Sequence, residues 1–253
     1  MKRPILFLSL LLIAAHAHAI GHLTSIDLVD RHARQTLPVY WHQGKAWVVG
    51  QPGNEYQITL RNQAGGDVLA VVSVDGINVI SGEAASPQQS GYVIDGGQSI
   101  NIAGWRKSMA RTAAFYFTSL GDSYAARTGR PDNVGVIGVA LYRRRAEPVS
   151  IAPRESSPYA PPAAGASGSM QDRAESGRAP SVMREKSLGT GHGRSESSHA
   201  RQVEFERASR FPAERIEIYY VSHANLVARG VIPARPPREP QAFPGPFVPD
   251  PWR

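Results

Sequence analysis

The sequence predicts an all-β protein, folded as a two-sheet sandwich with jelly-roll-like connections. Short apolar runs recur between turn signals rich in Gly, Pro, Asn and Asp, a spacing typical of β-sandwiches. Several runs alternate polar and apolar residues with the period of two expected of a half-buried strand. Helical patterns do not separate these runs, so βαβ units are not expected. An immunoglobulin-like sandwich is the alternative, and the long connections favour the jelly roll.

The clearest local pattern is a hairpin. Residues 37–42 and 45–50 are rich in β-formers and flank Gln43-Gly44, a two-residue connection suited to a tight reversal. Residues 55–62 alternate cleanly, with every second residue apolar. They are therefore predicted to form a half-buried strand.

The next run predicts the centre of a sheet. Residues 68–74 are apolar almost throughout, which indicates a strand covered on both sides, and Asp75-Gly76 ends it as a turn. Further strands are expected at residues 25–31, 77–80, 91–94, 99–105, 113–118 and 134–142. The glycines in the last of these indicate a bulge or a close backbone approach. Residues 119–133 are polar and are predicted as a long exposed loop.

Composition divides the rest of the chain. Residues 147–187 are rich in Pro, Ser, Ala, Gly and charge, and they are predicted to be a disordered insertion. Residues 233–253 carry closely spaced prolines and are predicted to be a disordered tail with polyproline II character. Residues 20–146 are then the main part of the sandwich, and residues 188–232 supply strands that complete the sheet.

The later segment is too small to fold alone without disulfides or a metal. Strands are expected at residues 201–207 and 214–221, and both need a sheet to join. Residues 224–230 are predicted as a short helical turn that Gly230 ends.

Residues 1–19 are predicted to be a cleavable signal peptide. Lys2 and Arg3 precede an apolar stretch that is too short to span a bilayer, and Ala17-His18-Ala19 supplies small residues for cleavage before Ile20. An uncleaved anchor is the alternative. The mature chain is expected to be exported, periplasmic or secreted, with no transmembrane span.

Charge and cysteine usage exclude several classes of chemistry. The chain has 28 Lys and Arg against 21 Asp and Glu, and it has no cysteine. Disulfides, thiol catalysis and Cys-ligated metals are therefore excluded. The positive charges are scattered and form no nucleic-acid motif, so nucleic acid is not an expected partner. A basic surface is compatible with an anionic envelope polysaccharide.

Several stretches resemble a known group of proteins. They are residues 68–78, 91–108, 122–143, 188–193, 203–209 and 218–232. These stretches resemble a family of uncharacterised exported bacterial proteins. The resemblance covers both candidate folded segments and implies that they form one unit, but it implies no activity.

The first place to expect a ligand site is the loop at residues 119–133, together with the strand before it. Loops on β scaffolds commonly carry binding residues. A combination of aromatic rings and guanidinium groups suits a sugar or a carboxylate ligand. The candidate ligand-binding residues are Trp105, Arg106, Asp122, Tyr124, Arg127 and Arg130. The alternative is an internally hydrogen-bonded loop in which Arg127 pairs with Asp122 or Asp132.

Other motifs favour structural roles. The mature histidines lack the local spacing of metal ligands, and Gly189–Gly193 lacks the lysine of a phosphate-binding loop, so it is interpreted as a flexible turn. Asp75 is interpreted as a turn residue in preference to a catalytic carboxylate. No nucleophile-elbow sequence is present. No catalytic residue, metal or cofactor is therefore predicted.

The leading hypothesis is a non-enzymatic binding or scaffolding module of the cell envelope. Its partner would be an envelope polysaccharide or another envelope protein. One alternative is a module that binds glycans or anionic surfaces, and another is a hydrolase with a dispersed site, because a fold alone does not fix function.

Overall fold

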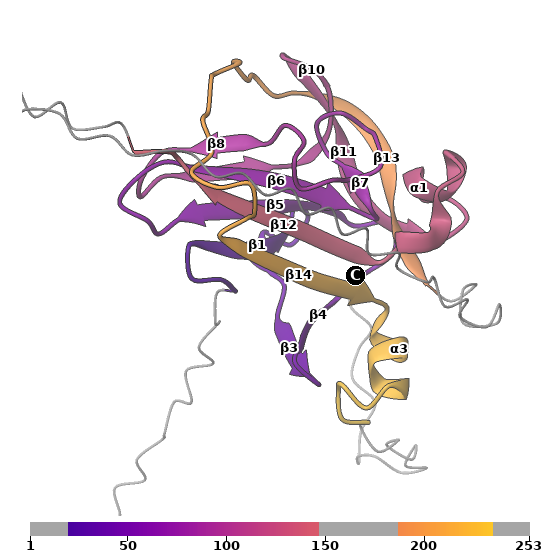
Figure 1. The fold of residues 1–253 in the computed structure, drawn as a ribbon. Helices are drawn as coiled ribbons and strands as arrows, with labels where there is room; N and C mark the ends of the chain where they lie inside the picture. Colours follow the sequence, from indigo (N-terminus) through magenta and orange to yellow (C-terminus); the bar gives the residue numbers. More distant parts are fainter. Residues whose placement is uncertain (1–19, 147–186, 235–253) are drawn as a thin grey trace, which may run out of the picture.

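Two seven-stranded sheets pack face to face in the computed structural model, which describes residues 20–146 and 187–234 (Figure 1). The sheets do not close into a barrel, so the predicted all-β, two-sheet sandwich is confirmed. The predicted signal peptide, nearly all of the insertion and residues 235–253 of the tail lie outside the described residues. Within the described ranges, no helix has the length and hydropathy needed to cross a membrane.

Sheet A is antiparallel throughout. Its strand order is β10-β11-β5-β1-β2, with β13 also paired to β11 and β9 also paired to β5. The strands are β1 (Thr24–Asp30), β2 (Gln35–Thr36), β5 (Glu55–Asn62), β9 (Ser99–Ile102), β10 (Gly104–Ser108), β11 (Arg111–Ser119) and β13 (Leu188–Ser197).

Sheet B has the order β3-β4-β14-β12-β6-β7, with β8 also paired to β6. The strands are β3 (Val39–His42), β4 (Lys45–Val49), β6 (Val68–Val74), β7 (Ile77–Asn78), β8 (Tyr92–Ile94), β12 (Val136–Arg143) and β14 (Glu214–Val221). The pair β4–β14 is parallel, and the other pairs of this sheet are antiparallel. The strand predicted at residues 214–221 therefore lies inside sheet B, between β4 and β12.

The main core fills the space between the sheets, and β6 shows why its sequence is apolar on both faces. Val72 and Val74 belong to the main core, whereas Leu69 and Val71 pack with Tyr142 in a second cluster on the outer face of sheet B. A third cluster forms on the same outer face around Trp47, Val221 and Leu226. The prediction that residues 68–74 are covered on both sides is confirmed.

The segment at residues 119–133 contains more regular structure than the predicted exposed loop. It forms α1 (Tyr124–Arg127) and the 3-10 turn η1 (Pro131–Asn133). The hydroxyl of Ser123 accepts a hydrogen bond from the Ala126 amide, which caps the first turn of α1. The predicted helical turn near the end of the described chain is present as α3 (His223–Ala228), and Gly230 follows it with φ of 70°.

The prediction of a flexible turn at Gly189–Gly193 is wrong, because these residues form the first half of β13. Their pairing places Gly191 opposite Tyr116 on β11. The Tyr116 ring lies over Gly191, so a methyl group at that position would overlap the ring. The glycine-rich sequence here accommodates an aromatic neighbour and does not indicate mobility.

The prediction of a strand at residues 201–207 is also wrong. Only an isolated bridge joins Arg207 to Arg144 in this stretch. The segment instead lies against the outer face of sheet B, where the Arg207 guanidinium lies 4.4 Å from the centre of the Tyr142 ring and Phe205 packs on the second cluster. Its alternating pattern therefore reflects side-chain contact with a sheet face, without strand pairing.

Candidate functional site

The six candidate residues from the loop and its preceding strand are only partly brought together. The rings of Trp105 and Tyr124 are 4.9 Å apart, and the Tyr124 hydroxyl lies beside Gly82. The Arg130 guanidinium donates to the carbonyl of that same Gly82 at 2.9 Å. Trp105 is buried, and its Nε1 donates to the Gly191 carbonyl at 3.1 Å. These three side chains therefore hold α1 and β13 against the sandwich.

The other three candidates lie apart from this group. Arg106 donates to the Ser198 carbonyl at 2.6 Å and to the Tyr92 hydroxyl. Asp122 accepts a hydrogen bond from the Ser119 hydroxyl at 2.9 Å, and Arg127 is exposed in the last turn of α1. The six residues therefore do not converge on one site, and most of them make structural contacts within or around the loop.

A buried polar chain crosses the core between the sheets. The Asp75 carboxylate accepts hydrogen bonds from the amides of Gly135 at 2.9 Å and Thr190 at 2.7 Å, and from the Tyr220 hydroxyl. The Thr190 hydroxyl lies 2.8 Å from both the Tyr220 and the Tyr56 hydroxyls. Because β13 and β5 belong to sheet A and β14 to sheet B, this chain joins the two sheets.

The protonation states in this chain follow from burial. Desolvation raises the pKa of Asp75 to about 6, and its hydrogen bonds from Tyr220, Gly135 and Thr190 partly oppose that rise. Burial also raises the pKa of Tyr56 and of Tyr220 well above the usual tyrosine value, so both stay protonated. A carboxylate only accepts hydrogen bonds, so Tyr220 donates its proton to Asp75. The Thr190 hydroxyl then donates to Tyr220, and the Tyr56 hydroxyl donates to Thr190.

Asp75 is therefore more than the turn residue that the sequence indicates. Its φ of 53° and the φ of 73° at Gly76 confirm the turn. Its side chain is 1% exposed, with all three of its partners distant in sequence. Such a group stabilises the packing of the sheets and does not meet a substrate at the surface.

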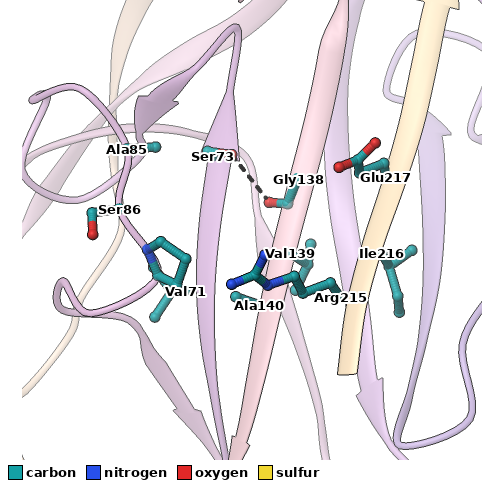
Figure 2. Close-up of a pocket in the computed structure, with 11 residues that line it drawn as sticks. Val71, Ser73, Ala85, Ser86, Gly138, Val139, Ala140, Arg215, Ile216 and Glu217 are labelled. Atoms are coloured by element: carbon teal, nitrogen blue, oxygen red, sulfur yellow. Dashed lines mark hydrogen bonds between the residues drawn. The ribbon is translucent and has the colours of Figure 1, made fainter. Parts of the chain in front are cut away.

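An open trough lies on the outer face of sheet B. Its volume is about 210 Å³, and Figure 2 shows residues that line it. Its floor and walls are two rows of residues that lie opposite one another on β6, β12 and β14. The rows are Ser73, Gly138 and Glu217, and Val71, Ala140 and Arg215. The middle strand contributes the smallest side chains, so the trough follows β12.

Gly138 explains one signal that the sequence contained. A Cβ at this position would lie 2.8 Å from the Ser73 hydroxyl, and no backbone lies within 4 Å of it. Gly138 therefore marks a hollow on the outer face. The predicted close backbone approach is found instead at Gly135, where an added Cβ would lie 3.3 Å from the Tyr220 carbonyl oxygen and 3.4 Å from that of Leu188.

The trough contains two charged side chains that could bind a ligand, Arg215 and Glu217. Figure 2 shows the Arg215 side chain reaching from β14 across β12. Within residues 20–146 and 187–234, the Arg215 guanidinium has no hydrogen-bond or ion-pair partner. Glu217 points toward the same strand and accepts one hydrogen bond, from the Tyr219 hydroxyl at 2.8 Å. The trough therefore offers an unpaired guanidinium and a carboxylate with acceptor capacity to spare.

The rim of the trough is a positioned loop. Ala85, Ser86 and Pro87 line one side of the trough. The buried Asn78 fixes this loop, because its amide group donates to Gln89 Oε1 and to the Ser90 carbonyl, both at 3.2 Å. A rim held from beneath by a buried side chain keeps its shape when the trough is empty.

A second hollow, of about 400 Å³, lies on sheet A and differs in its charges. There Arg31 makes a paired contact with Glu196 at 3.0 and 2.9 Å, and Arg194 makes one with Glu55 at 2.8 and 2.9 Å. Two further ion pairs of 3.3 Å join Arg31 to Glu55 and Arg194 to Glu196. The hydrogen bond from Arg194 lowers the pKa of Glu55. These charges satisfy one another and tie β13 to β5, so this hollow is a weaker candidate for a ligand.

Among the described residues, no cluster of His, Asp and Glu has the arrangement of a metal site. Comparison with protein-family models, curated proteins and solved structures gave no match to this chain. The resemblance to exported bacterial proteins therefore stays a prediction.

The trough residues were missed by sequence reasoning. Arg215 and Glu217 alternate with apolar residues of β14, so they look like ordinary solvent-facing positions. Only the register of β14 on β12 shows that both flank Gly138 and Ala140. The one usable signal was Gly138, a glycine inside an otherwise apolar strand.

Proposed function

We propose that the chain is a non-catalytic binding module of the cell envelope, which holds an extended acidic peptide in the trough on sheet B. The observation that carries the proposal is the Arg215 guanidinium above the small side chains of β12, which has no partner among residues 20–146 and 187–234. Guanidinium groups form paired, charge-assisted hydrogen bonds with carboxylates, and these are the strong ones in proteins. The envelope location rests on the predicted signal peptide in residues 1–19.

The shape of the trough favours an extended chain. β6 and β14 lie on either side of β12, so their side-chain rows are about 10 Å apart at the usual strand spacing. The two small residues between them, Gly138 and Ala140, lower the floor over a short length of β12. A single extended peptide, with one acidic side chain directed at Arg215, matches this width.

The lining favours a peptide over a glycan. Val71, Ala140 and Pro87 form an apolar part of the lining, beside the polar Ser73, Ser86, Arg215 and Glu217. A sugar chain would bring many hydroxyls against this apolar wall without hydrogen-bond partners, which costs free energy. A proline-rich peptide around one carboxylate lowers that cost, because proline has no backbone N–H to leave without a partner.

The test is a fluorescence anisotropy titration with a labelled peptide of prolines around one glutamate. Arg215→Ala is expected to weaken binding about tenfold, equivalent to about 1.4 kcal/mol, because one charge-assisted contact is lost. The matched control is Arg61→Ala, which removes an exposed arginine from sheet A. A peptide with glutamine in place of glutamate should bind the unaltered chain as weakly as the glutamate peptide binds the Arg215 variant.

Equal losses of peptide affinity in the Arg215 and Arg61 variants would show that the peptide is held only by general charge attraction. That result would contradict the proposal. Polygalacturonate, a carboxylate-bearing glycan, serves as the rival probe. If it binds through Arg215 while the peptide does not, the ligand is a glycan and the alternative module is correct.

A further inference from the structure

The described part of the chain ends on the same face as the trough. α3 follows β14 directly (Figure 1), and Leu226 of α3 is buried in the third cluster with Trp47 and Val221. Val231 and Ile232 pack on this cluster too, and the Ile232 amide bonds to the Leu226 carbonyl at 3.3 Å. The chain therefore leaves the described region on the outer face of sheet B.

A buried donor at this exit lacks a partner. Trp47 is 8% exposed, and its Nε1 has no hydrogen-bond acceptor in the described part of the chain. Buried tryptophan N–H groups usually find a partner. A polyproline II segment makes no internal hydrogen bonds, so its carbonyls are free to accept one. The proline-rich sequence that follows Ala234 favours this conformation.

The direction of β14 fixes the order in which a returning segment meets the trough. β14 runs toward α3, so a segment that returns along it from Ala234 runs antiparallel to it. That segment passes Glu217 first and Arg215 second. Glu217 lies four residues from Val221, or about 13 Å, and Arg215 lies about 7 Å further, at the usual rise of a strand.

The sequence after Ala234 carries the complementary charges in the complementary order. Residues 235–241 read RPPREPQ, with prolines that favour an extended polyproline II chain. At about 3.1 Å per residue, a polyproline II segment of residues 235–241 would span about 22 Å, against about 20 Å from Val221 to Arg215 along β14. In a segment that returns along β14, Arg238 precedes Glu239, in the same order as Glu217 precedes Arg215.

We propose that residues 235–241 of this chain dock in the trough as a tethered ligand, with Arg238 on Glu217 and Glu239 on Arg215. This inference rests on the proposed function in taking the trough as a peptide-binding surface. An external peptide then competes with a segment of the same chain, whose effective concentration is set by its tether.

The chain has no cysteine, so two introduced thiols form a unique pair. Ser86→Cys on the rim and Gln241→Cys in the tail are expected to form a disulfide under mild oxidation, measured as intact mass. The control pair joins Gln241→Cys to Ser99→Cys, an exposed position on sheet A. Docking should make the first pair form about tenfold faster, because the thiols are held within bridging distance.

Charge reversal tests the register. Arg215→Glu should slow formation of the Ser86–Gln241 pair about tenfold, and Glu239→Arg in the same chain should restore it. Arg215 is exposed, so these variants keep the fold, which circular dichroism checks. Equal rates for the two thiol pairs, or a loss that Glu239→Arg does not restore, overturn tail docking.

The labelled peptide separates this inference from the proposed function. If the tail competes, Glu239→Gln should strengthen binding of the external peptide about tenfold, and the tenfold loss expected for Arg215→Ala is then measured in the Glu239→Gln chain, because Arg215→Ala alone also releases the tail. If the peptide binds neither the unaltered chain nor the Glu239→Gln variant while the thiol pair still forms, the trough binds only the tail and the proposed function fails. If the peptide binds both forms equally and the thiol pair does not form, the tail inference fails alone.

Discussion

Asp75 has a local role that its sequence predicts and long-range contacts that its sequence does not predict. Its Asp-Gly pair predicts the tight turn that the structure contains. The side chain, however, accepts from Gly135, Thr190 and Tyr220, which lie 60, 115 and 145 residues away in sequence. Local patterns predict turns because turns are local. Partners this distant depend on strand order, which a single sequence does not reveal.

The raised pKa of Asp75 predicts how stability depends on pH. Its pKa is about 6 in the folded protein against an ordinary value of 3.8, so the folded state binds this proton more tightly. Its contribution is fully present below about pH 4 and is lost as the pH rises through about 6. The shift corresponds to roughly 3 kcal/mol at about 1.36 kcal/mol per pKa unit.

The measurement is urea denaturation at pH 4.5 and pH 7.5. The free energy of unfolding of the unaltered chain should fall between these values by roughly 2 kcal/mol more than that of Asp75→Asn, because pH 4.5 lies above the ordinary aspartate pKa and part of the contribution is already lost there. Subtracting the variant removes the contributions of all other titrating groups. Asp95→Asn, in an exposed turn that also precedes glycines, is the control and should behave like the unaltered chain. An identical pH dependence for Asp75→Asn and the unaltered chain would refute the assigned role.

β13 shows why an element can be missed although its neighbours are predicted well. The hairpin of β3 and β4, and the strands β5, β6 and β14, follow from apolar runs or alternation in their own sequences. The first half of β13 has three glycines at alternate positions and gives no such signal. Its strand form depends on Tyr116 of the neighbouring β11 and on the Asp75 carboxylate, both supplied by the rest of the fold.

Gly191→Ala tests this account of β13. The added methyl group would overlap the Tyr116 ring, so one of the two must move. We expect a loss of about 1–3 kcal/mol in the free energy of unfolding, typical of overpacking at a tight contact. Gly121→Ala, where a Cβ meets open space, should change stability by less than about 0.5 kcal/mol in the same urea titration. Similar values for both variants would show that Tyr116 does not constrain β13.

The molecule as a whole is assembled from sequence-distant parts. Beyond residues 147–186, β13 joins sheet A and β14 joins sheet B, so both sheets need the later segment. The sequence predicted the sandwich and the need for these later strands, because composition and periodicity carry that information. It did not predict the trough, because the trough depends on the order β6-β12-β14.

The sequence and the structure favour two different ligand surfaces, which lie on different elements. The sequence favoured the segment around α1, whose Trp105, Tyr124 and Arg130 make internal contacts. The structure favours the trough, where Arg215 is unpaired in the described part of the chain. A site-resolved measurement distinguishes them directly.

That measurement is a titration of isotope-labelled protein with the proline-rich glutamate peptide, followed by backbone amide NMR shifts. The proposed function predicts that the largest shifts fall on Ser73, Gly138 and Glu217, and that Arg215→Ala raises the peptide concentration needed to produce them about tenfold. Largest shifts on Tyr124 and Arg127, unchanged in the Arg215 variant, would contradict the trough and return the site to the α1 segment.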